Sequence, residues 1–297
     1  MARIGRLGDE LGYDLLLAAD HLYATGSDPF EPFFEGWSTL AAWAGATRRT
    51  ELGLLVGAAP LRHPALVAKL AATLDHQSGG RAILGLGSGW HEREFADHGL
   101  PLGRPRERLA RLDEALAIIR ALLAGETVTI DSDFFHLDGV RTAPLPLRSP
   151  VPVLVGAEGE RYGLRVVARH ADLWHWWAPM GSTEAFRHKL GVLARHCADV
   201  GRDAAAIAPL PGAKVILRND PTEAERTFER AAAARGWDGE IREYVRASAW
   251  LGRPAEVAEA LGRYREAGAA GFICQVFGPY DDETIVRLAN EVRPTVG

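Results

Sequence analysis

Two residues suited to proton-transfer chemistry, Asp20 and His21, follow directly after an apolar segment, Leu15–Ala19. Histidine titrates near neutral pH, so it donates or accepts a proton readily during a reaction. If the apolar segment is a strand of a parallel sheet, both side chains lie at its carboxyl end, where α/β enzymes place their chemistry. The sequence therefore predicts His21 as a catalytic residue, the structural alternative being a pair that only caps a loop.

Two further apolar segments, Leu52–Val56 and Ala82–Leu86, each end in small residues. Gly57 begins the first run, and Ser88 and Gly89 lie in the second. A strand end without bulky side chains lets a flat or phosphorylated ligand approach the backbone closely. We therefore expect Gly57, Ser88 and Gly89 to contact a cofactor.

The second of these strand ends continues as GLGSGWHEREF, over residues 85–95. Its glycines are spaced GxGxG and not GxGxxG, which argues against a dinucleotide-binding turn. HEREF is not HExxH, so the sequence predicts no zinc site and no other metal. His91 and Glu92 supply polar groups next to the strand end, and we expect His91 in a substrate pocket.

A fourth apolar segment, Val151–Val155, is followed by Gly156, Ala157, Glu158 and Gly159 and then by a predicted helix, 161–169. Free backbone N–H groups at a helix start bind anions. This turn is therefore a candidate phosphate site, the alternative being an ordinary strand-to-helix connection.

Three tryptophans occur within the four residues 174–177. Such bulky apolar side chains are unfavourable in water, so they must pack against something. We expect Trp176 and Trp177 to wall an aromatic substrate or cofactor pocket, the alternative being a packed core or a dimer surface.

Strands and helices alternate along nearly the whole chain, a pattern that predicts an α/β fold with a parallel sheet. Seven core strands are expected, beginning near residues 15, 52, 82, 151, 171, 213 and 271. This number is close to the eight of a (β/α)8 TIM barrel, and the first strand would precede the helix 4–11, where it is apparently missing. We expect a single domain, 1–297, with a β-hairpin excursion near 127–137 and an extended helical region near 222–264.

The 297 residues are 47% hydrophobic and 25% charged, with a net charge of −5. This composition is that of a globular protein, and the absence of a basic block argues against a nucleic-acid partner. No apolar run reaches the roughly 20 residues of a membrane span, and the start of the chain lacks the apolar core of a signal peptide. We therefore expect a cytoplasmic protein with no membrane partner.

The sequence resembles the bacterial luciferase-like family of flavin and deazaflavin oxidoreductases, whose fold is a (β/α)8 barrel. The segments that carry the resemblance are LGYDLLLAADH (11–21), LGLLVGAAPLRHPALVAKLAATLDHQSGGRAILGLGSGW (52–90), RLDEALAIIRALLAGE (111–126) and VPVLVGAEGERYGLRVVARHADLW (151–174). The second segment is the most specific, and its details are most similar to the branch that uses coenzyme F420, a 5-deazaflavin.

The resemblance implies roles for individual residues. His21 would lie beside the flavin-like ring, and a cis peptide between Leu55 and Val56 would form a bulge behind that ring. The turn 156–159 would hold the cofactor phosphate. Asp20 and Trp90 are expected to contact the cofactor as well. Trp90 stands where related F420-dependent sugar-phosphate dehydrogenases have an acid, which argues against sugar phosphates as substrates.

The function we expect is F420-dependent hydride transfer to or from a small organic substrate. The first alternative is an FMNH2-dependent monooxygenase that uses O2, and the second is an inactive barrel without its first strand. Substrate choice would lie in the loops 22–34, 91–105 and 179–182. By the resemblance, the protein is expected to be a homodimer or a higher homo-oligomer.

Overall fold

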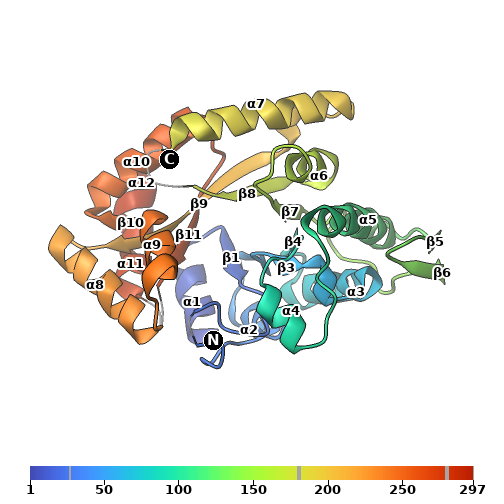
Figure 1. Ribbon diagram of the computed structural model, residues 1–297, viewed down its shortest axis with the longest axis horizontal. Helices are drawn as coiled ribbons and strands as arrows, with labels where there is room; N and C mark the ends of the chain where they lie inside the picture. Colours follow the sequence, from blue (N-terminus) through green and yellow to red (C-terminus); the bar gives the residue numbers. More distant parts are fainter. Residues whose placement is uncertain (27, 179–181, 278–280, 297) are drawn as a thin grey trace. The chain divides into compact units, whose positions relative to one another are not determined.

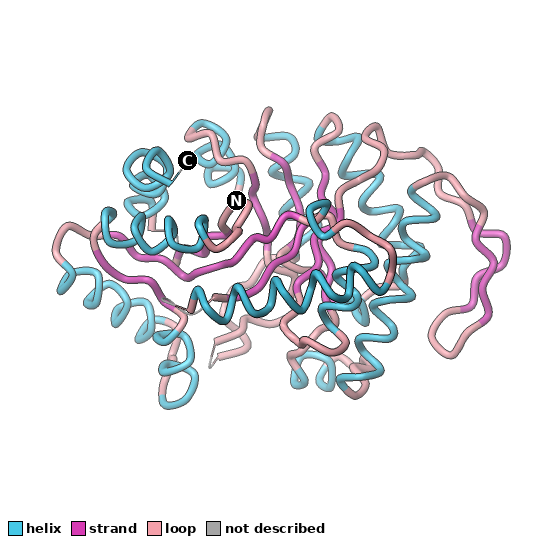
Figure 2. Tube along the Cα trace, turned by 90° about the horizontal axis from the view of Figure 1, so that it is seen from above, coloured by secondary structure: helices cyan, strands magenta, loops and turns pink. Residues whose placement is uncertain are grey.

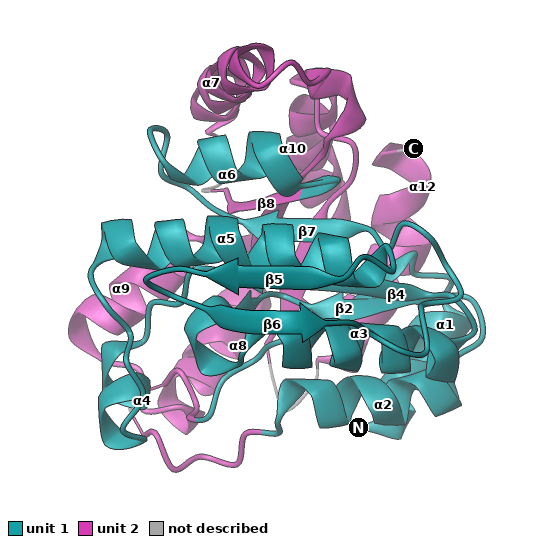
Figure 3. Ribbon diagram, turned by 90° about the vertical axis from the view of Figure 1, so that its right-hand side faces the viewer, with its two compact units in different colours: residues 1–22, 34–173 teal, residues 23–33, 174–297 magenta. Residues whose placement is uncertain are grey.

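The computed structural model describes residues 1–26, 28–178, 182–277 and 281–296. Most of the predicted specificity loop 179–182 therefore lies outside the described residues. The chain divides into two compact units, which Figure 3 colours separately. Unit 1 comprises residues 1–22 and 34–173, and unit 2 comprises residues 23–33 and 174–297. The single domain expected from the sequence stays a prediction.

Unit 1 alternates strands with helices, as Figure 1 shows. Its elements are α1 (Ala2–Glu10), β1 (Leu15–Ala18), α2 (Gly36–Ala46), β2 (Glu51–Leu54), β3 (Gly57–Ala58), a 3-10 turn (Ala59–Leu61), α3 (Pro64–Ser78), β4 (Ala82–Gly87), α4 (Glu92–Asp97), α5 (Pro105–Leu123), β5 (Val128–Asp131), β6 (His136–Val140), β7 (Val153–Gly156) and α6 (Gly163–His170). The alternation confirms the α/β class that the apolar pattern predicts.

The strands of unit 1 pair in the order β1-β2-β4-β7, all parallel, with β3 also pairing with β4. Strand β4 is buried along its whole length, as expected for a parallel strand covered on both faces. Strands β5 and β6 form a separate antiparallel hairpin that projects beyond α3 and α5 (Figures 1 and 2).

Helix α3 shows how local sequence sets the boundaries of these elements. Pro64 occupies its first turn, where no amide hydrogen bond is lost, and the His63 side chain accepts a hydrogen bond from the amide of Ala65. Gly79 ends the helix with φ 71°, a left-handed conformation that costs glycine little. None of the helices in the described ranges has the length and apolar character that crossing a membrane requires.

Glycine is required where strands β2 and β4 approach each other most closely. A Cβ on Gly85 would lie 1.8 Å from the carbonyl oxygen of Leu54, whereas a Cβ on Gly45, in helix α2, would meet nothing within 4 Å. We expect Gly85→Ala to lower the free energy of unfolding by about 1–3 kcal/mol, because the backbone must move. Gly45→Ala should raise it by about 0.5–1 kcal/mol, because alanine favours a helix.

Urea denaturation of both variants measures these two changes. Equal effects of the two substitutions would contradict the close approach of the strands at Gly85.

Unit 2 continues the same alternation. Its elements are β8 (Leu173–Trp177, whose first residue is counted in unit 1), α7 (Thr183–Asp199), a 3-10 turn (Ala204–Ala206), β9 (Ala208–Leu217), α8 (Pro221–Ala234), α9 (Gly239–Ala247), β10 (Ala249–Gly252), α10 (Pro254–Glu266), β11 (Ile273–Val276), α11 (Asp282–Arg287), a π turn (Leu288–Val292) and α12 (Arg293–Val296). Strands β10 and β11 each pair in parallel with β9.

Strand β10 corrects the expectation of an uninterrupted helical region at 222–264. Helices α8, α9 and α10 occupy most of that region, but Ala249–Gly252 pairs with 214–217 of β9 as a strand. Four residues are too few for an alternating pattern to stand out, and Trp250 also fits an apolar helix face. Only the pairing with β9 makes this segment a strand. It therefore adds one parallel strand to those predicted.

Candidate functional site

The carboxyl ends of five strands of unit 1 lie at one edge of its sheet. The parallel register pairs Ala18 of β1 with Leu54 of β2, and Gly87 of β4 with both Ala58 of β3 and Gly156 of β7. The predicted residues 20–21, 55–57, 88–91 and 156–159 all follow these strand ends directly. The structure therefore brings the unit 1 part of the predicted site to a single edge.

The peptide bond between Leu55 and Val56 is cis, at the position that the sequence resemblance implies. The Val56 side chain lies against the glycines that end the next two strands. A Cβ on Gly87 would be 2.7 Å from Val56 Cγ2, and a Cβ on Gly156 would be 3.0 Å from it. The bulge between β2 and β3 thus fits because two neighbouring strands end without side chains.

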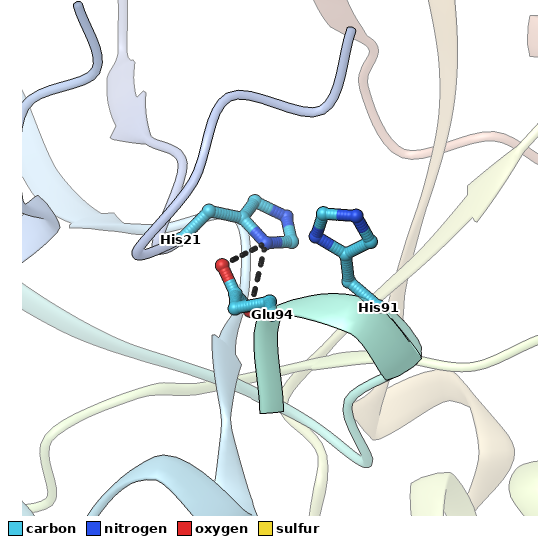
Figure 4. Close-up of side chains that lie close together, drawn as sticks. All are labelled: His21, His91 and Glu94. Carbon is cyan, nitrogen blue, oxygen red and sulfur yellow. Dashed lines mark hydrogen bonds and ion pairs between the residues drawn. The ribbon is translucent and has the colours of Figure 1, made fainter. Parts of the chain in front are cut away.

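His21 is held by a carboxylate that the sequence reasoning missed. Its Nδ1 lies 3.2 and 3.3 Å from the two carboxylate oxygens of Glu94, which is 1% exposed (Figure 4). The amide of Leu22 donates to the same carboxylate at 2.5 Å. Because a carboxylate accepts, we assign the proton facing it to Nδ1 of His21.

Glu94 reaches His21 because the predicted loop after Trp90 contains a short helix, α4. His91 is its N-cap residue and Glu94 lies three positions later, so both side chains are on one face of the first turn. The sequence reasoning treated residues 91–105 as a loop and did not consider Glu94. A glutamate three residues after an N-cap was the available signal.

Two aromatic rings lie edge-on to His21. The ring centroids of Trp90 and His91 lie 5.5 and 6.0 Å from that of His21, both edge-on. Trp90 is 59% exposed, whereas the Nδ1 of His91 is buried and accepts or donates no hydrogen bond within the described residues. Burial lowers the pKa of His91, partly offset by the nearby Glu94 charge.

Asp20 lies beneath this site in a buried ion pair and not on its surface. It is 2% exposed, and Arg62 donates to its two carboxylate oxygens at 2.6 and 3.0 Å. Burial raises the pKa of Asp20, and Arg62 opposes this shift without cancelling it. Contact of Asp20 with a cofactor stays a prediction; in the structure its carboxylate accepts two hydrogen bonds from Arg62.

Arg62 also bonds Glu35, the N-cap of helix α2, at 2.8 Å. Burial alone would raise the pKa of Glu35, but the amides of Ser38 and Trp37 and the Arg62 charge lower it overall. The arginine thus joins the loop after β1, the segment after β3 and the start of α2. Arg62 lies within the segment 52–90 that carries the family resemblance, but the sequence alone predicts no role for it.

The predicted phosphate loop, 156–159, leads into helix α6 later than expected. The helix begins at Gly163 and not at Arg161, and the Gly159 carbonyl accepts from the Leu164 amide at 2.9 Å. Two guanidinium groups pack on the ring of Tyr162, Arg161 at 5.1 Å and Arg106 at 5.7 Å from its centroid. Arg106, in the first turn of α5, is therefore a second cation near this loop that the sequence did not single out.

The two tryptophans predicted as pocket walls have different environments within unit 2. Trp176 is 6% exposed and stacks on Phe186 of α7, with ring centroids 6.1 Å apart. Trp174 stacks on the same ring, because alternate residues of a strand share a face. Trp176 therefore packs in the sheet–helix core, the alternative left open by the sequence, and its role as a pocket wall stays a prediction.

Trp177 lies on the opposite face of β8, partly exposed, with the Lys214 ammonium 4.7 Å from its ring centroid. On that face it contacts His175, whose ring centroid is 4.6 Å away. A role for Trp177 in a substrate pocket stays a prediction.

His175 makes the stability of the protein depend on pH. Burial lowers its pKa to about 4, against a small opposing effect of its hydrogen bond to the Leu210 carbonyl. At pH values below 6.5, the ordinary pKa of histidine, His175 binds a proton in the unfolded chain but not in the folded chain. The free energy of unfolding should therefore fall as pH drops from 6.5 toward 4, by up to about 1.4 kcal/mol per pH unit.

Urea denaturation at a series of pH values measures this slope. His175→Gln should flatten it, whereas His188→Gln, on the exposed face of α7, should leave it unchanged. A slope that is the same in wild type and His175→Gln would refute the assignment.

Comparison with known proteins identifies the family of this chain. A model of the luciferase-like monooxygenase family matches residues 1–271. The chain belongs to the luciferase-like monooxygenase family.

This luciferase-like chain is similar to two curated relatives whose activities are named. It is 36% identical over 203 residues to the phthiodiolone/phenolphthiodiolone dimycocerosates ketoreductase of Mycobacterium kansasii, covering 66% of this chain and 53% of that one. It is 41% identical over 157 residues to the F420-dependent glucose-6-phosphate dehydrogenase of Beutenbergia cavernae, covering 52% and 45%. The chain spans about half the length of the curated relatives it matches.

Among solved structures, an F420-dependent secondary alcohol dehydrogenase in complex with an F420-acetone adduct is similar with a TM-score of 0.85. The match covers 100% of this chain and 94% of that chain at 18% identity, so it bears on the fold alone. The fold is the luciferase-like α/β TIM-barrel type, as the sequence predicts.

The residues of unit 1 fit the flavin-like group that the family binds. Gly87 and Gly156 end two adjacent strands without a Cβ, and the Val56 side chain of the cis-peptide bulge occupies the space beside them, so the bulge sits close to this edge of the sheet. In the first turn of α5, the Nε of Arg108 is buried and has no hydrogen-bond partner among the described residues. Together with Arg106 and Arg161, it offers donors for an anionic tail.

Proposed function

We propose that this protein is an oxidoreductase that binds a deazaflavin of the coenzyme F420 type and transfers hydride to or from a small organic substrate. The observation that carries the proposal is the pair of His21 and buried Glu94 at the strand edge that also holds the Leu55–Val56 bulge. The F420 dependence of the glucose-6-phosphate dehydrogenase of Beutenbergia cavernae, a relative of this chain, supports the choice of cofactor.

His21 supplies the proton in this proposal. When bound, the deazaflavin supplies or accepts the hydride at its C5 atom. As a carbonyl is reduced, its oxygen needs a proton, which the Nε2–H of a His21 imidazolium donates; in the oxidation of an alcohol, neutral Nε2 accepts that proton. Glu94 stabilises the imidazolium through Nδ1 and keeps the ring oriented.

The other residues of unit 1 bind and orient the reactants. The turn 156–159, with Arg106 and Arg161 beside it, would hold the anionic part of the cofactor. Exposed Trp90 would cover the reacting centre from the solvent side of His21 and offers no carboxylate for a sugar phosphate. We therefore expect simple ketones or secondary alcohols as substrates.

Titration of the purified protein with F420 and, separately, with FMN tests the cofactor. Binding is followed by quenching of each cofactor's own fluorescence, and micromolar binding of F420 is expected. Arg106→Ala should weaken it, whereas Arg104→Ala, which removes an 87% exposed side chain from the same end of α5, should not. Binding of FMN alone would overturn the deazaflavin assignment, and binding of neither would favour the inactive barrel.

The second candidate function is an FMNH2-dependent monooxygenase, which the description of the family model favours. Oxygen uptake distinguishes the two reactions. A monooxygenase consumes O2 with reduced FMN in the presence of substrate, whereas F420-dependent hydride transfer proceeds at the same rate under nitrogen. A panel of ketones, secondary alcohols and sugar phosphates, assayed with reduced or oxidised F420, then gives the substrate class. Homo-oligomerisation stays a prediction.

A further inference from the structure

Three metal-binding side chains converge at the edge of unit 1. One donor atom from each of His21, His91 and Glu94 lies within 4.8 Å of the other two, and Figure 4 shows both imidazole rings beside the carboxylate. The donors come from two segments, with His21 and Glu94 73 residues apart, so sequence spacing alone reveals no metal motif. Two imidazoles and a carboxylate are a donor set that Zn²⁺ and related cations bind.

A second observation on His91 points to a missing partner. Its Nδ1 is buried and has no hydrogen-bond partner among the residues that the structure describes. Buried polar atoms without a partner are uncommon in folded proteins, and an ion is one of the few explanations for them. The carboxylate of Glu94, beside this nitrogen, provides a negative charge to balance a cation.

The surroundings also orient these donors. The Leu22 amide donates to one carboxylate oxygen of Glu94, which fixes the orientation of the carboxylate toward His21. Carboxylates that ligate metals are usually held by such a hydrogen bond. In a tetrahedral zinc site the ligand atoms are about 3.3 Å apart, so the separation of Nδ1 of His21 from Glu94, 3.2 Å, already suits the metal.

We propose that His21, His91 and Glu94 form a site for a divalent transition-metal cation of the Zn²⁺ type, with one coordination position open to solvent. The cation would bind Nδ1 of His21 and the Glu94 carboxylate in place of the proton between them, and the proton displaced from Nδ1 would move to Nε2, so that the imidazole stays neutral. Bound metal would therefore prevent His21 from accepting a proton, and this consequence rests on the proposed function.

Calorimetric titration of the metal-free protein with ZnCl2, in a buffer that does not chelate, tests the site. One Zn²⁺ should bind per chain, with micromolar or tighter affinity. His91→Ala and His21→Ala should each weaken binding at least about tenfold, since even the loss of an outer partner of a metal ligand costs about 10–100-fold. His136→Ala is the matched control, because it removes a histidine that contacts a single carboxylate, Asp131, on the exposed hairpin.

Failure to bind Zn²⁺, or binding that His91→Ala and His21→Ala leave unchanged, would overturn the site. Glu94→Gln keeps an acceptor for the Leu22 amide, and circular dichroism checks that each variant is folded. Ni²⁺ gives an independent readout: it should quench Trp90, whose ring lies 5.0 Å from that of His91, and Trp90→Phe should remove that part of the quenching.

Activity separates this inference from the proposed function. Zn²⁺ should inhibit alcohol oxidation over the concentration range in which it binds, and EDTA should restore the rate. Stoichiometric binding at the three residues without inhibition would support the site and overturn the role of His21 as the base. Inhibition that persists in His91→Ala, without binding, would overturn the site.

Discussion

Replacing His21 with alanine is expected to lower kcat by at least about 10²-fold, the usual contribution of a positioned acid or base. The imidazole follows β1, and buried Glu94 holds its Nδ1. Without the imidazole, a water molecule at the same position must donate or accept the proton. Cofactor affinity should change little, because the binding of the anionic tail involves other residues.

The measurement is steady-state turnover with the best substrate from the ketone and alcohol panel, together with F420 affinity by fluorescence. His136→Ala, which removes an exposed histidine from the hairpin, should leave both unchanged. Turnover in His21→Ala equal to that of wild type would remove His21 from the mechanism. Loss of F420 binding in that variant would instead indicate a structural role.

Glu94 should behave as a positioning residue in the same assays. Glu94→Gln retains the acceptor for Leu22 but loses the charge that stabilises the imidazolium. We therefore expect kcat to fall with little change in KM. A rise in KM at constant kcat would show that Glu94 acts through substrate binding and not through His21.

Replacing Arg62 with methionine is expected to destabilise the fold by about 3–5 kcal/mol at neutral pH, because it leaves a buried charge without its partner. Asp20 is 2% exposed and makes both of its ion-pair hydrogen bonds with this guanidinium, whose side chain is 16% exposed. Methionine keeps much of the apolar volume of the arginine stem, so the loss reports mainly the charge.

The effect of Arg62→Met should depend on pH in a stated direction. The pKa of Asp20 is already raised above 3.8 by burial, and removal of Arg62 takes away the main group that lowers it. In the variant, the free energy of unfolding should therefore fall as pH rises from about 4 through the raised pKa of Asp20, because the carboxylate becomes charged without a partner. In acid, where Asp20 is neutral, the difference in stability between the variant and wild type should shrink.

Urea denaturation of wild type and Arg62→Met at neutral and acidic pH measures both effects. Arg263→Met is the control, because Arg263 and Glu259 form an exposed ion pair, 48% and 75% exposed, of the kind that contributes little to stability. A defect in Arg62→Met as small as that of the control would mean that Asp20 is neutral or solvated in the folded protein.

Local patterns in the sequence were sufficient for the scaffold of the site. Continuous apolar runs predicted β1, β2, β4 and β7, because a strand buried on both faces needs apolar residues throughout. Small residues marked the strand ends, and the family resemblance placed the cis bond at Leu55–Val56, where the structure has it. The predicted position of His21 followed from its place after β1.

The contacts that make this edge a site required the tertiary structure. Glu94 meets His21 across 73 residues, and Arg62 meets Asp20 across 42. Neither pairing leaves a periodic signal in one sequence, because each depends on which strand ends become neighbours. The sequence also left undecided which face of β8 helix α7 covers. Alternation places Trp176 and Trp177 on opposite faces, but only the structure shows that α7 packs on the face of Trp176.

The sequence by itself therefore determined the alternation of strands and helices, the family, and the residues at each strand end, because these depend on local composition and periodicity. The tertiary structure alone decided which charges are buried together: the Asp20–Arg62 pair below the edge and the cluster of His21, His91 and Glu94 on it. The physical reason is that burial and pairing arise from the packing of distant segments, and the cost of an unpaired buried charge makes these pairings specific.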